Sequence, residues 1–290
     1  MTETGRLTAL NLIGAGALSE ALIMGILEAD VLPPEAIYVT NRSDDERLLD
    51  LSRRFGVQAV RDASRFPSAL TVLAVKPKDV SEALYHHRPL IVRAPLLLSA
   101  VAGVPMRALR SALGVKPPLA RAMTNTSAVV RAAVTVVAYE DGVPENLRAQ
   151  VEALFSAVGS VERIPEEAMD LVTALSGSGP AYVYYLLEAL TAAAAALGMS
   201  YDLAARLARQ TVIGAGCMLA ARPETPESLR LKIMSPGGTT EAALAALDAG
   251  DFRALVARAV EAAERRSKAL AEQFDASLKH AAHGKNASNP

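Results

Sequence analysis

Short apolar runs alternate with amphipathic stretches through the first half of the chain. The apolar runs are nearly continuous, as in strands that are buried on both faces of a sheet. They lie at residues 10–13, 37–40, 70–75, 96–101 and 134–139. Apolar residues recur with helical spacing between them, at residues 19–29, 45–55 and 145–158, and Gly56 predicts the end of the second helix. This alternation predicts an α/β fold with a doubly wound, parallel sheet.

The pattern changes after Ile164-Pro165, where only helical spacing is found. The predicted helices lie at residues 166–175, 181–197, 202–221, 226–233, 239–249 and 252–274. Gly- and Pro-rich segments separate them. We therefore expect an α/β domain over residues 1–164, an all-helical domain over 165–275 and a disordered polar tail over 276–290.

Composition excludes several classes of function. The 290 residues include 30 Lys and Arg against 31 Asp and Glu, which argues against a broad nucleic-acid surface. Aromatic residues make up 4% with no Trp, which argues against stacking platforms. One Cys and no signal-peptide pattern predict a cytoplasmic protein. Residues 181–197 carry one charge, but their Ala content predicts a buried core helix and not a membrane span.

No metal site is expected from the His and Cys residues. His86-His87 and the pair His280 and His283 lack partners at metal-ligand spacing. Cys217 lies in an Ala-rich predicted helix, where we expect inert packing. Glu188 lies in an apolar predicted helix and is interpreted as an interface residue.

A glycine motif follows the first predicted strand and opens the next helix. It reads Gly14-Ala15-Gly16-Ala17-Leu18-Ser19, in the context that a dinucleotide fingerprint requires. Gly14 would make the tight turn, and Gly16 would let the backbone approach a pyrophosphate at the helix N-terminus. Ser19 replaces the third glycine and is still small enough for helix–strand packing. The motif favours a Rossmann-type domain, with a plain structural turn as the alternative.

The end of the second predicted strand indicates which dinucleotide is bound. NAD sites usually place a carboxylate there, whereas this chain reads Asn41-Arg42-Ser43. Arg42 and Ser43 would suit a 2′-phosphate, so NADPH is the predicted cofactor and NADH the alternative. The same residues would also suit a simple cap of the next helix, and Asp44 and Asp45 lie close by.

Two further segments are candidates for ligand binding. Ala74-Val75-Lys76-Pro77 ends a buried strand, where ligands bind in doubly wound sheets, although an ordinary strand exit fits equally well. Residues 235–240, Ser-Pro-Gly-Gly-Thr-Thr, precede a predicted helix. Their glycines, hydroxyls and helix N-terminus suit a small carboxylate, and a helix cap is the alternative.

Together these motifs resemble the pyrroline-5-carboxylate reductase family, whose members catalyse the last step of proline synthesis. The resemblance covers residues 10–270. It is carried by GAGALSEAL at 14–22, LAVKPKDV at 73–80, MTNT at 123–126, ALSGSGPAYVYYLLEAL at 174–190 and SPGGTTEAAL at 235–244. It implies NAD(P)H-dependent hydride transfer to the C=N carbon of a cyclic imino acid, 1-pyrroline-5-carboxylate, without a metal. It also implies a homodimer built through the helical domain, which assembles further in many members, commonly to decamers.

The resemblance also implies roles for particular residues. Its cofactor contacts are Gly14, Ala15, Gly16, Ala17, Leu18, Ser19, Asn41, Ala74, Val75, Lys76, Pro77, Val101, Ala102 and Gly103. Its substrate contacts are Glu166, Ser235, Gly238, Thr239 and Thr240. It implies that the two sets meet in a cleft between the domains, with residues 235–240 supplied by the partner subunit. The Thr240 hydroxyl would then hydrogen-bond the ring nitrogen as the catalytic residue.

Three departures from the family pattern keep alternatives open. Ala17-Leu18 stands where Asn-Met or Gln-Met is usual, and Ser127 where Pro is usual. Residues 231–234, Leu-Lys-Ile-Met, replace the common Asp-x-Val-Thr. A divergent paralogue that reduces a related imine and a non-catalytic NADPH-binding scaffold are the alternatives. A β-hydroxyacid-type dehydrogenase would need a catalytic Lys, and Lys232 and Lys268 lie in no fitting motif.

Overall fold

The computed structural model describes residues 6–114 and 116–286. The chain divides into two compact units. Unit 1 consists of the residues up to Gly177 together with those from Ala263 onward, and unit 2 is Ser178–Ala262.

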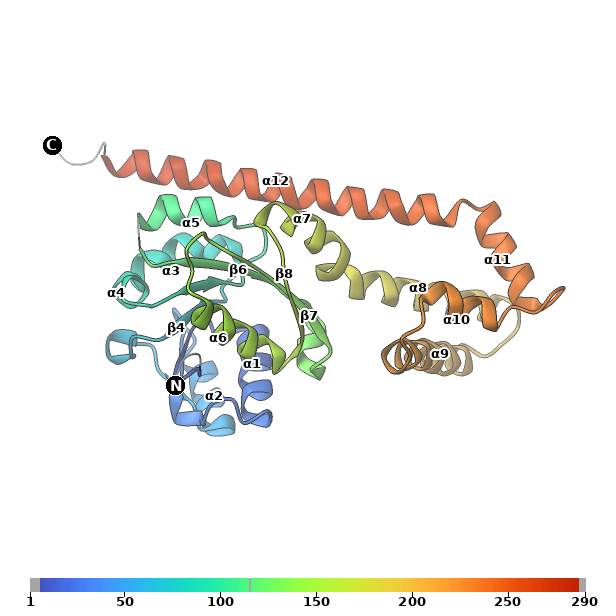
Figure 1. Cartoon of the computed structure of the whole chain (residues 1–290), viewed down its shortest axis with the longest axis horizontal. Coiled ribbons are helices and arrows are strands. Elements are labelled where there is room, and N and C mark those ends of the chain that lie inside the picture. The colour runs from blue at the N-terminus through green and yellow to red at the C-terminus, as the bar shows by residue number, and fades with distance from the viewer. Residues whose placement is uncertain (1–5, 115, 287–290) are drawn as a thin grey trace. The chain divides into compact units, whose positions relative to one another are not determined.

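Unit 1 is built on an eight-stranded sheet in the order β3-β2-β1-β4-β5-β6-β7-β8 (Figure 1). The strands are β1 (Leu10–Ile13), β2 (Ile37–Thr40), β3 (Gln58–Ala59), β4 (Leu70–Leu73), β5 (Leu97–Ser99), β6 (Leu119–Met123), β7 (Ala133–Tyr139) and β8 (Gly159–Arg163). The first six in this order pair in parallel, with β1 next to β2 and β4. This confirms the predicted doubly wound α/β fold.

Helices cover both faces of the sheet and enclose two cores. On one face lie α1 (Ala17–Glu28), α2 (Asp45–Phe55) and α6 (Glu145–Ser156). On the other lie α3 (Val80–His86), α4 (Arg88–Val92) and α5 (Met106–Leu113). Successive strand residues point to opposite faces, so Leu12 packs in the first core and Ile13 in the second. A strand covered on both sides therefore needs an unbroken apolar run.

Local signals place several elements where they were predicted. Helix α2 begins after Asp44, whose side chain accepts a hydrogen bond from the Arg47 N–H, and ends at Gly56, which is left-handed with φ 72°.

Short 3-10 turns connect other elements. They are η1 (Pro34–Ala36), η2 (Ala63–Arg65), η3 (Pro77–Asp79), η4 (Thr126–Val130) and η5 (Glu166–Ala168).

The sheet also departs from the prediction. Strands β3, β6 and β8 were not predicted, and β7 runs antiparallel to β6, so the sheet is mixed. Strand β3 has only two residues, and β6 contains the charged Arg121. Neither has the continuous apolar run by which the other strands were recognised.

The boundary between the units lies later than residue 165. After η5, the chain forms α7 (Met169–Val172) and a π-helical segment, η6 (Thr173–Gly177). Met169 and Ala174 are buried, and Met169 packs in the second core of unit 1. Residues 166–177 therefore belong to unit 1 by packing, although their helical spacing placed them with the helical domain.

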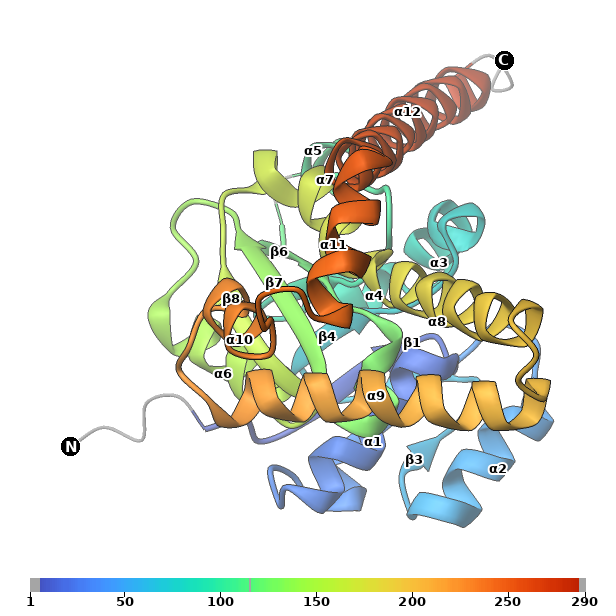
Figure 2. The same ribbon diagram turned by 90° about the vertical axis from the view of Figure 1, so that its right-hand side faces the viewer.

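Unit 2 is all helical. It contains α8 (Gly179–Ala196), α9 (Tyr201–Ala221), α10 (Pro226–Lys232), α11 (Thr239–Ala249) and the first part of α12 (Phe252–Asn286). Helices α8 and α9 lie side by side (Figures 1 and 2).

The prediction of a buried core helix over 181–197 is wrong for the single chain, because Thr191 is the buried residue identified in α8. None of the helices described combines the length and apolar character required to cross a bilayer.

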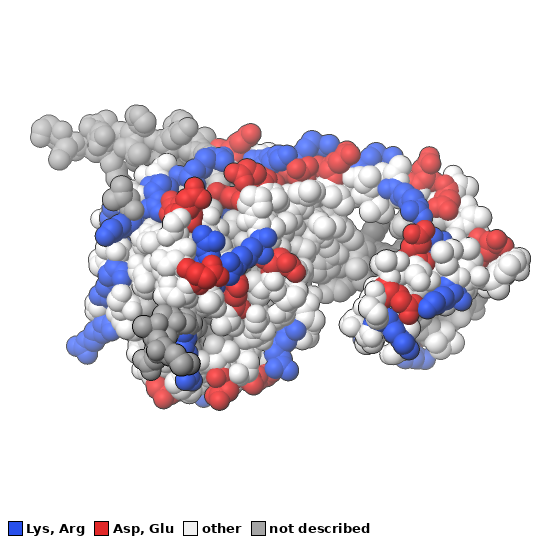
Figure 3. Space-filling view, in the orientation of Figure 1, with Lys and Arg blue, Asp and Glu red and all other residues white. Residues whose placement is uncertain are grey.

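Helix α12 is longer than predicted. It continues to Asn286, so the expected disordered tail is helical over residues 276–286, while 287–290 lie outside the described residues. Helix-forming residues continue past Phe274 without Pro, and the first Gly is residue 284. Charged residues of both signs are interspersed along α12 up to residue 274 (Figure 3).

Candidate active site

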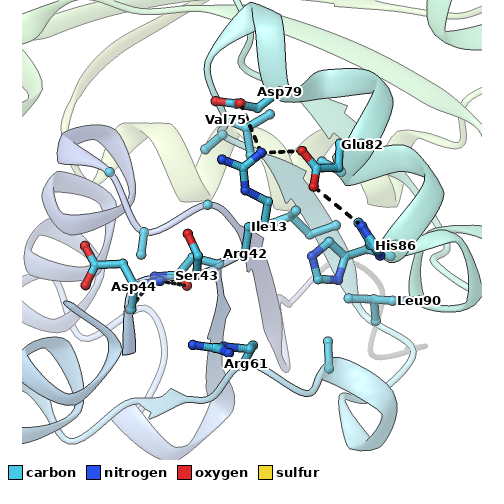
Figure 4. A pocket seen from close by; sticks show the side chains of 18 of the residues that line it. Ile13, Arg42, Ser43, Asp44, Arg61, Val75, Asp79, Glu82, His86 and Leu90 are labelled. Atoms are coloured by element: carbon cyan, nitrogen blue, oxygen red, sulfur yellow. Dashed lines mark hydrogen bonds and ion pairs between the residues drawn. The ribbon is translucent and has the colours of Figure 1, made fainter. Parts of the chain in front are cut away.

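A pocket of about 800 Å³ lies in unit 1 at the carboxyl ends of β1, β2 and β4. Its walls come from the glycine loop after β1, the loop after β2, the end of β4 and helix α3 (Figure 4). Nine residues predicted to contact a cofactor line it. They are Gly14, Ala15, Gly16, Asn41, Arg42, Ser43, Ala74, Val75 and Lys76.

The glycine loop is held between the strands. The Gly14 N–H donates to Thr40 O at 2.8 Å, and the Ala74 N–H donates to Ile13 O at 2.8 Å. Gly14 has φ +115°, and a Cβ there would collide with Ala74 O. A side chain at position 14 is therefore excluded by both backbone conformation and space.

The start of α1 fits the pyrophosphate of a dinucleotide. Gly16 is the N-cap of α1 and makes no side-chain capping bond. No atom lies within 4 Å of the position that a Gly16 Cβ would take. Gly16 thus leaves open space beside the start of α1, where the first-turn N–H groups have no partner within the helix and stabilise an anion.

Some predicted cofactor residues lie outside the lining of this pocket. Ser19 is buried, and its hydroxyl donates to Gly14 O at 2.6 Å, which ties α1 to the loop. The others are Ala17, Leu18, Pro77, Val101, Ala102 and Gly103. Their contact with a cofactor stays a prediction.

In the loop after β2, Asn41 and Asp44 stabilise the loop and the start of α2, whereas the Arg42 side chain extends into the pocket. Asn41 braces the loop, since its Nδ2 donates to Asp44 O at 2.7 Å and its Oδ1 accepts from Asp44 N at 3.0 Å. Asp44 caps α2. Arg42 is thus not needed as a cap, and its guanidinium extends across the pocket toward α3 (Figure 4).

Arg42 is paired with carboxylates of the opposite wall. Its Nη1 hydrogen-bonds Glu82 and lies 3.7 Å from Asp79 Oδ1. The hydrogen bond and the charge of Glu82 hold the pKa of the Arg42 guanidinium above its usual value. Neither carboxylate was singled out from the sequence, because α3 was not predicted.

Three further lining residues were missed by sequence reasoning. Arg47 of α2 donates from Nε to Ala15 O at 3.0 Å and also pairs with Glu20 of α1. Arg61 pairs with Asp45, with 2.9 Å between Nε and Oδ1. His87 follows α3, where burial first and neighbouring His86 second lower the pKa of its imidazole. Isolated Arg residues carry no sequence signal for such contacts, and His86-His87 were considered only as metal ligands.

Glu166 has a structural role in unit 1. Its Oε1 accepts from the Met106 N–H at 2.6 Å, at the start of α5, and lies 3.3 Å from Arg121 Nη1. Arg121 is 3% exposed, so Glu166 balances a buried charge and caps a helix. Its predicted contact with substrate stays a prediction.

The loop of residues 235–240 forms a tight turn into α11 in unit 2. Gly237 has φ +69°, and the Gly238 N–H donates to Ser235 O at 2.9 Å. Glu241 accepts from the Gly237 N–H at 2.7 Å. The N–H groups of Gly237 and Gly238 are thus engaged within the loop, whereas those of the first turn of α11, which begins at Thr239, have no partner within the helix.

Among the side chains that the structure describes, those of residues 6–114 and 116–274, no group of three or more His, Cys, Asp or Glu is arranged to hold a metal ion.

Comparisons with protein families match two parts of the chain. The model for the pyrroline-5-carboxylate reductase dimerisation domain matches residues 166–270. A model for coenzyme F420-dependent NADP oxidoreductases matches residues 9–103.

Curated relatives cover nearly the whole chain. Pyrroline-5-carboxylate reductase 2 of Bacillus subtilis is 39% identical over 267 residues, which cover 91% of this chain and 96% of the relative. Pyrroline-5-carboxylate reductase of Arabidopsis thaliana is 36% identical over 262 residues, or 90% and 94% of the two chains.

Solved structures agree with these relatives. A pyrroline-5-carboxylate reductase from Coxiella burnetii has a TM-score of 0.85 at 33% identity and covers 91% of this chain and 98% of its own. A pyrroline carboxylate reductase from Plasmodium falciparum with NADP bound has a TM-score of 0.78 at 28% identity, with 92% and 99% covered. The chain therefore belongs to the pyrroline-5-carboxylate reductase family.

Proposed function

We propose that this protein reduces 1-pyrroline-5-carboxylate to L-proline with a nicotinamide dinucleotide, and that it prefers NADPH to NADH. One observation carries the proposal. The chain is 39% identical to a curated pyrroline-5-carboxylate reductase and has an open glycine loop at α1 together with a Ser-Pro-Gly-Gly-Thr-Thr loop at α11.

The unit 1 pocket supports the cofactor part of this proposal. Backbone N–H groups at the start of α1 would hold the pyrophosphate, and Arg42 with Ser43 would hold the 2′-phosphate. When bound, the dinucleotide supplies the hydride. The protein keeps the pocket in shape through the Gly14–Thr40 and Ala74–Ile13 hydrogen bonds.

The loop of residues 235–240 supports the substrate part. Its backbone N–H groups, with the hydroxyls of Ser235 and Thr239, would hold the imine carboxylate. The Thr240 hydroxyl would donate to the ring nitrogen, and Glu166 would add a further substrate contact. A hydroxyl is a weak acid, so Thr240 orients the ring and relays a proton while the C=N carbon accepts the hydride.

The match to a dimerisation domain supports a homo-oligomer. We propose a dimer built through unit 2, because α8 exposes large apolar side chains in the single chain. They are Tyr182, Val183, Tyr184, Tyr185, Leu186 and Leu190. An exposed apolar set of this size needs a partner surface. Assembly of dimers into a decamer and a cytoplasmic location, suited to the free Cys217, complete the proposal.

Steady-state kinetics tests the proposal. NADPH and NADH oxidation would be measured with 1-pyrroline-5-carboxylate and with its six-membered analogue, and the product identified as L-proline. We expect turnover with the five-membered imine and a higher kcat/KM for NADPH. NADPH binding without turnover of either imine would support the scaffold alternative. Preference for the six-membered ring would support a divergent paralogue.

A further inference from the structure

An ion pair spans the cofactor pocket from β2 to α3. Arg42 follows β2, and Glu82 lies in the middle of α3, forty positions later in the chain. Figure 4 shows the Arg42 guanidinium turned toward Glu82 and Asp79 and away from Ser43. The residue best placed to bind a 2′-phosphate is thus already engaged by two carboxylates.

The pair is open to solvent and to exchange. The side chains of Arg42 and Glu82 are 59% and 41% exposed, so their ion pair contributes little to stability. The other Glu82 oxygen, Oε1, lies 3.6 Å from His86 Nε2. Glu82 thus keeps a second basic neighbour on its own helix when Arg42 turns to another anion.

Arg47 is less available than Arg42, because it pairs with Glu20 and Asp50 and also supports the glycine loop. Arg61 pairs with Asp45 through side chains that are 53% and 68% exposed, so it is a second cation available in this pocket. Arg42 is the arginine whose charge Glu82 contacts. Glu82 acts on that charge directly.

The charge of Glu82 should weaken the binding of a 2′-phosphate in this pocket. A dianionic 2′-phosphate competes with Glu82 for the same guanidinium and is repelled by the Glu82 carboxylate. NADH carries a hydroxyl at this position and is nearly indifferent to that charge. We propose that Glu82 is a specificity-determining residue, which limits the preference for NADPH by competing with the 2′-phosphate for Arg42. The inference rests on the proposed function only for the identity of the cofactor.

Direct binding measurements on the full chain test this without any turnover. The probes are 2′,5′-ADP and 5′-AMP, which differ in the 2′-phosphate, followed by NADPH and NADH. For Glu82→Gln we expect the affinity for 2′,5′-ADP to rise by about three- to tenfold, and that for 5′-AMP to change by less than about twofold. The gain should shrink as salt is raised.

Two variants sharpen the assignment. Glu145→Gln also removes a helix-surface carboxylate that pairs with an arginine, Arg163, but away from the pocket, and it should leave both affinities unchanged. Arg42→Ala should weaken 2′,5′-ADP, and adding Glu82→Gln to it should restore less than Glu82→Gln gains alone.

Unchanged or weaker 2′,5′-ADP binding by Glu82→Gln overturns the inference, and weaker binding would mean that Glu82 orients Arg42 for the phosphate. Equal gains for both nucleotides, or failure of the wild-type chain to distinguish them, also overturn it. None of these outcomes depends on imine reduction, so the proposed reductase activity stands or falls separately.

Discussion

Two glycines of one loop have different surroundings. Gly14 has a left-handed backbone and no room for a Cβ, because Ala74 O lies against it. Gly16 has φ −80° and open space where its side chain would be. The first glycine is needed by the fold, and we propose that the second is needed by the ligand.

Substitution by alanine should separate these two roles. Gly14→Ala should lower the free energy of unfolding by about 2 kcal/mol or more. Gly16→Ala should change that free energy by less than about 0.5 kcal/mol, yet weaken NADPH and NADH alike by about tenfold. Denaturant unfolding and cofactor titration measure the two effects. A Gly16→Ala variant with wild-type affinity would contradict the proposed pyrophosphate position.

Thr240 is the residue whose hydroxyl we place at the ring nitrogen. Thr240→Ala should lower kcat by about ten- to a hundredfold and leave the NADPH dissociation constant unchanged. Thr240→Ser keeps the hydroxyl and should recover most of the rate. If Thr240→Ala and wild type turn over equally, the assigned role is wrong.

Local chemistry explains which site residues could be predicted. Gly14, Gly16 and Asn41-Arg42-Ser43 follow apolar runs that were recognised as strands, so their place at the carboxyl ends of the strands followed from topology. Glu82 and Arg47 reach the pocket from helix surfaces. Their contacts depend on how α3 and α2 pack, which no spacing along the chain encodes.

At the scale of elements, capping and periodicity predicted some helices well, whereas α3, α4 and α5 were not predicted. Helix α2 has an Asp cap, a left-handed Gly and a regular apolar face, and it was predicted over its full length. Strands β6 and β8 contain charged residues that are balanced elsewhere, Arg121 by Glu166 and Arg163 by Glu145 and Glu152. Because these charges are balanced by residues elsewhere in the fold, a search for continuous apolar runs does not detect these strands.

The free energy of unfolding should depend on pH through His87, which lies at the junction of α3 and α4. Its pKa is depressed in the folded chain, because burial and His86 disfavour the charged imidazole. The unfolded chain binds this proton at a higher pH than the folded chain does. The contribution of neutral His87 to the free energy of unfolding is therefore complete above the ordinary His pKa of 6.5 and declines as pH falls below it. His87→Gln should therefore reduce the loss of unfolding free energy between about pH 7.5 and about pH 5.5.

Denaturant unfolding at the two pH values measures this change. His86→Gln is the control, since it removes only the smaller cause and should have a smaller effect. An unchanged pH dependence in His87→Gln would show that another group dominates.

At the scale of the whole molecule, a homo-oligomer allows active sites to be shared between chains. We propose that residues 235–240 of one chain act on the imine held with the cofactor of its partner. Mixing Gly16→Val, which blocks the cofactor, with Thr240→Ala should then restore up to about a quarter of wild-type activity, because a mixed dimer regains one intact site.

Each variant alone at the same total concentration is the control, and native mass spectrometry would verify that mixed dimers form. Mixed dimers without regained activity would place the loop and the cofactor of one site in the same chain.

Helix α12 makes unit 2 an insertion within unit 1. The chain leaves unit 1 after Gly177 and returns from Ala263, where Ser267 donates to Asp170 at 2.7 Å and Ala271 is buried. A gene fragment that ends at Gly177 would thus omit part of unit 1. To express unit 1 with all of its packing partners, residues 263–274 would be rejoined to it by a linker that bridges the removed helices.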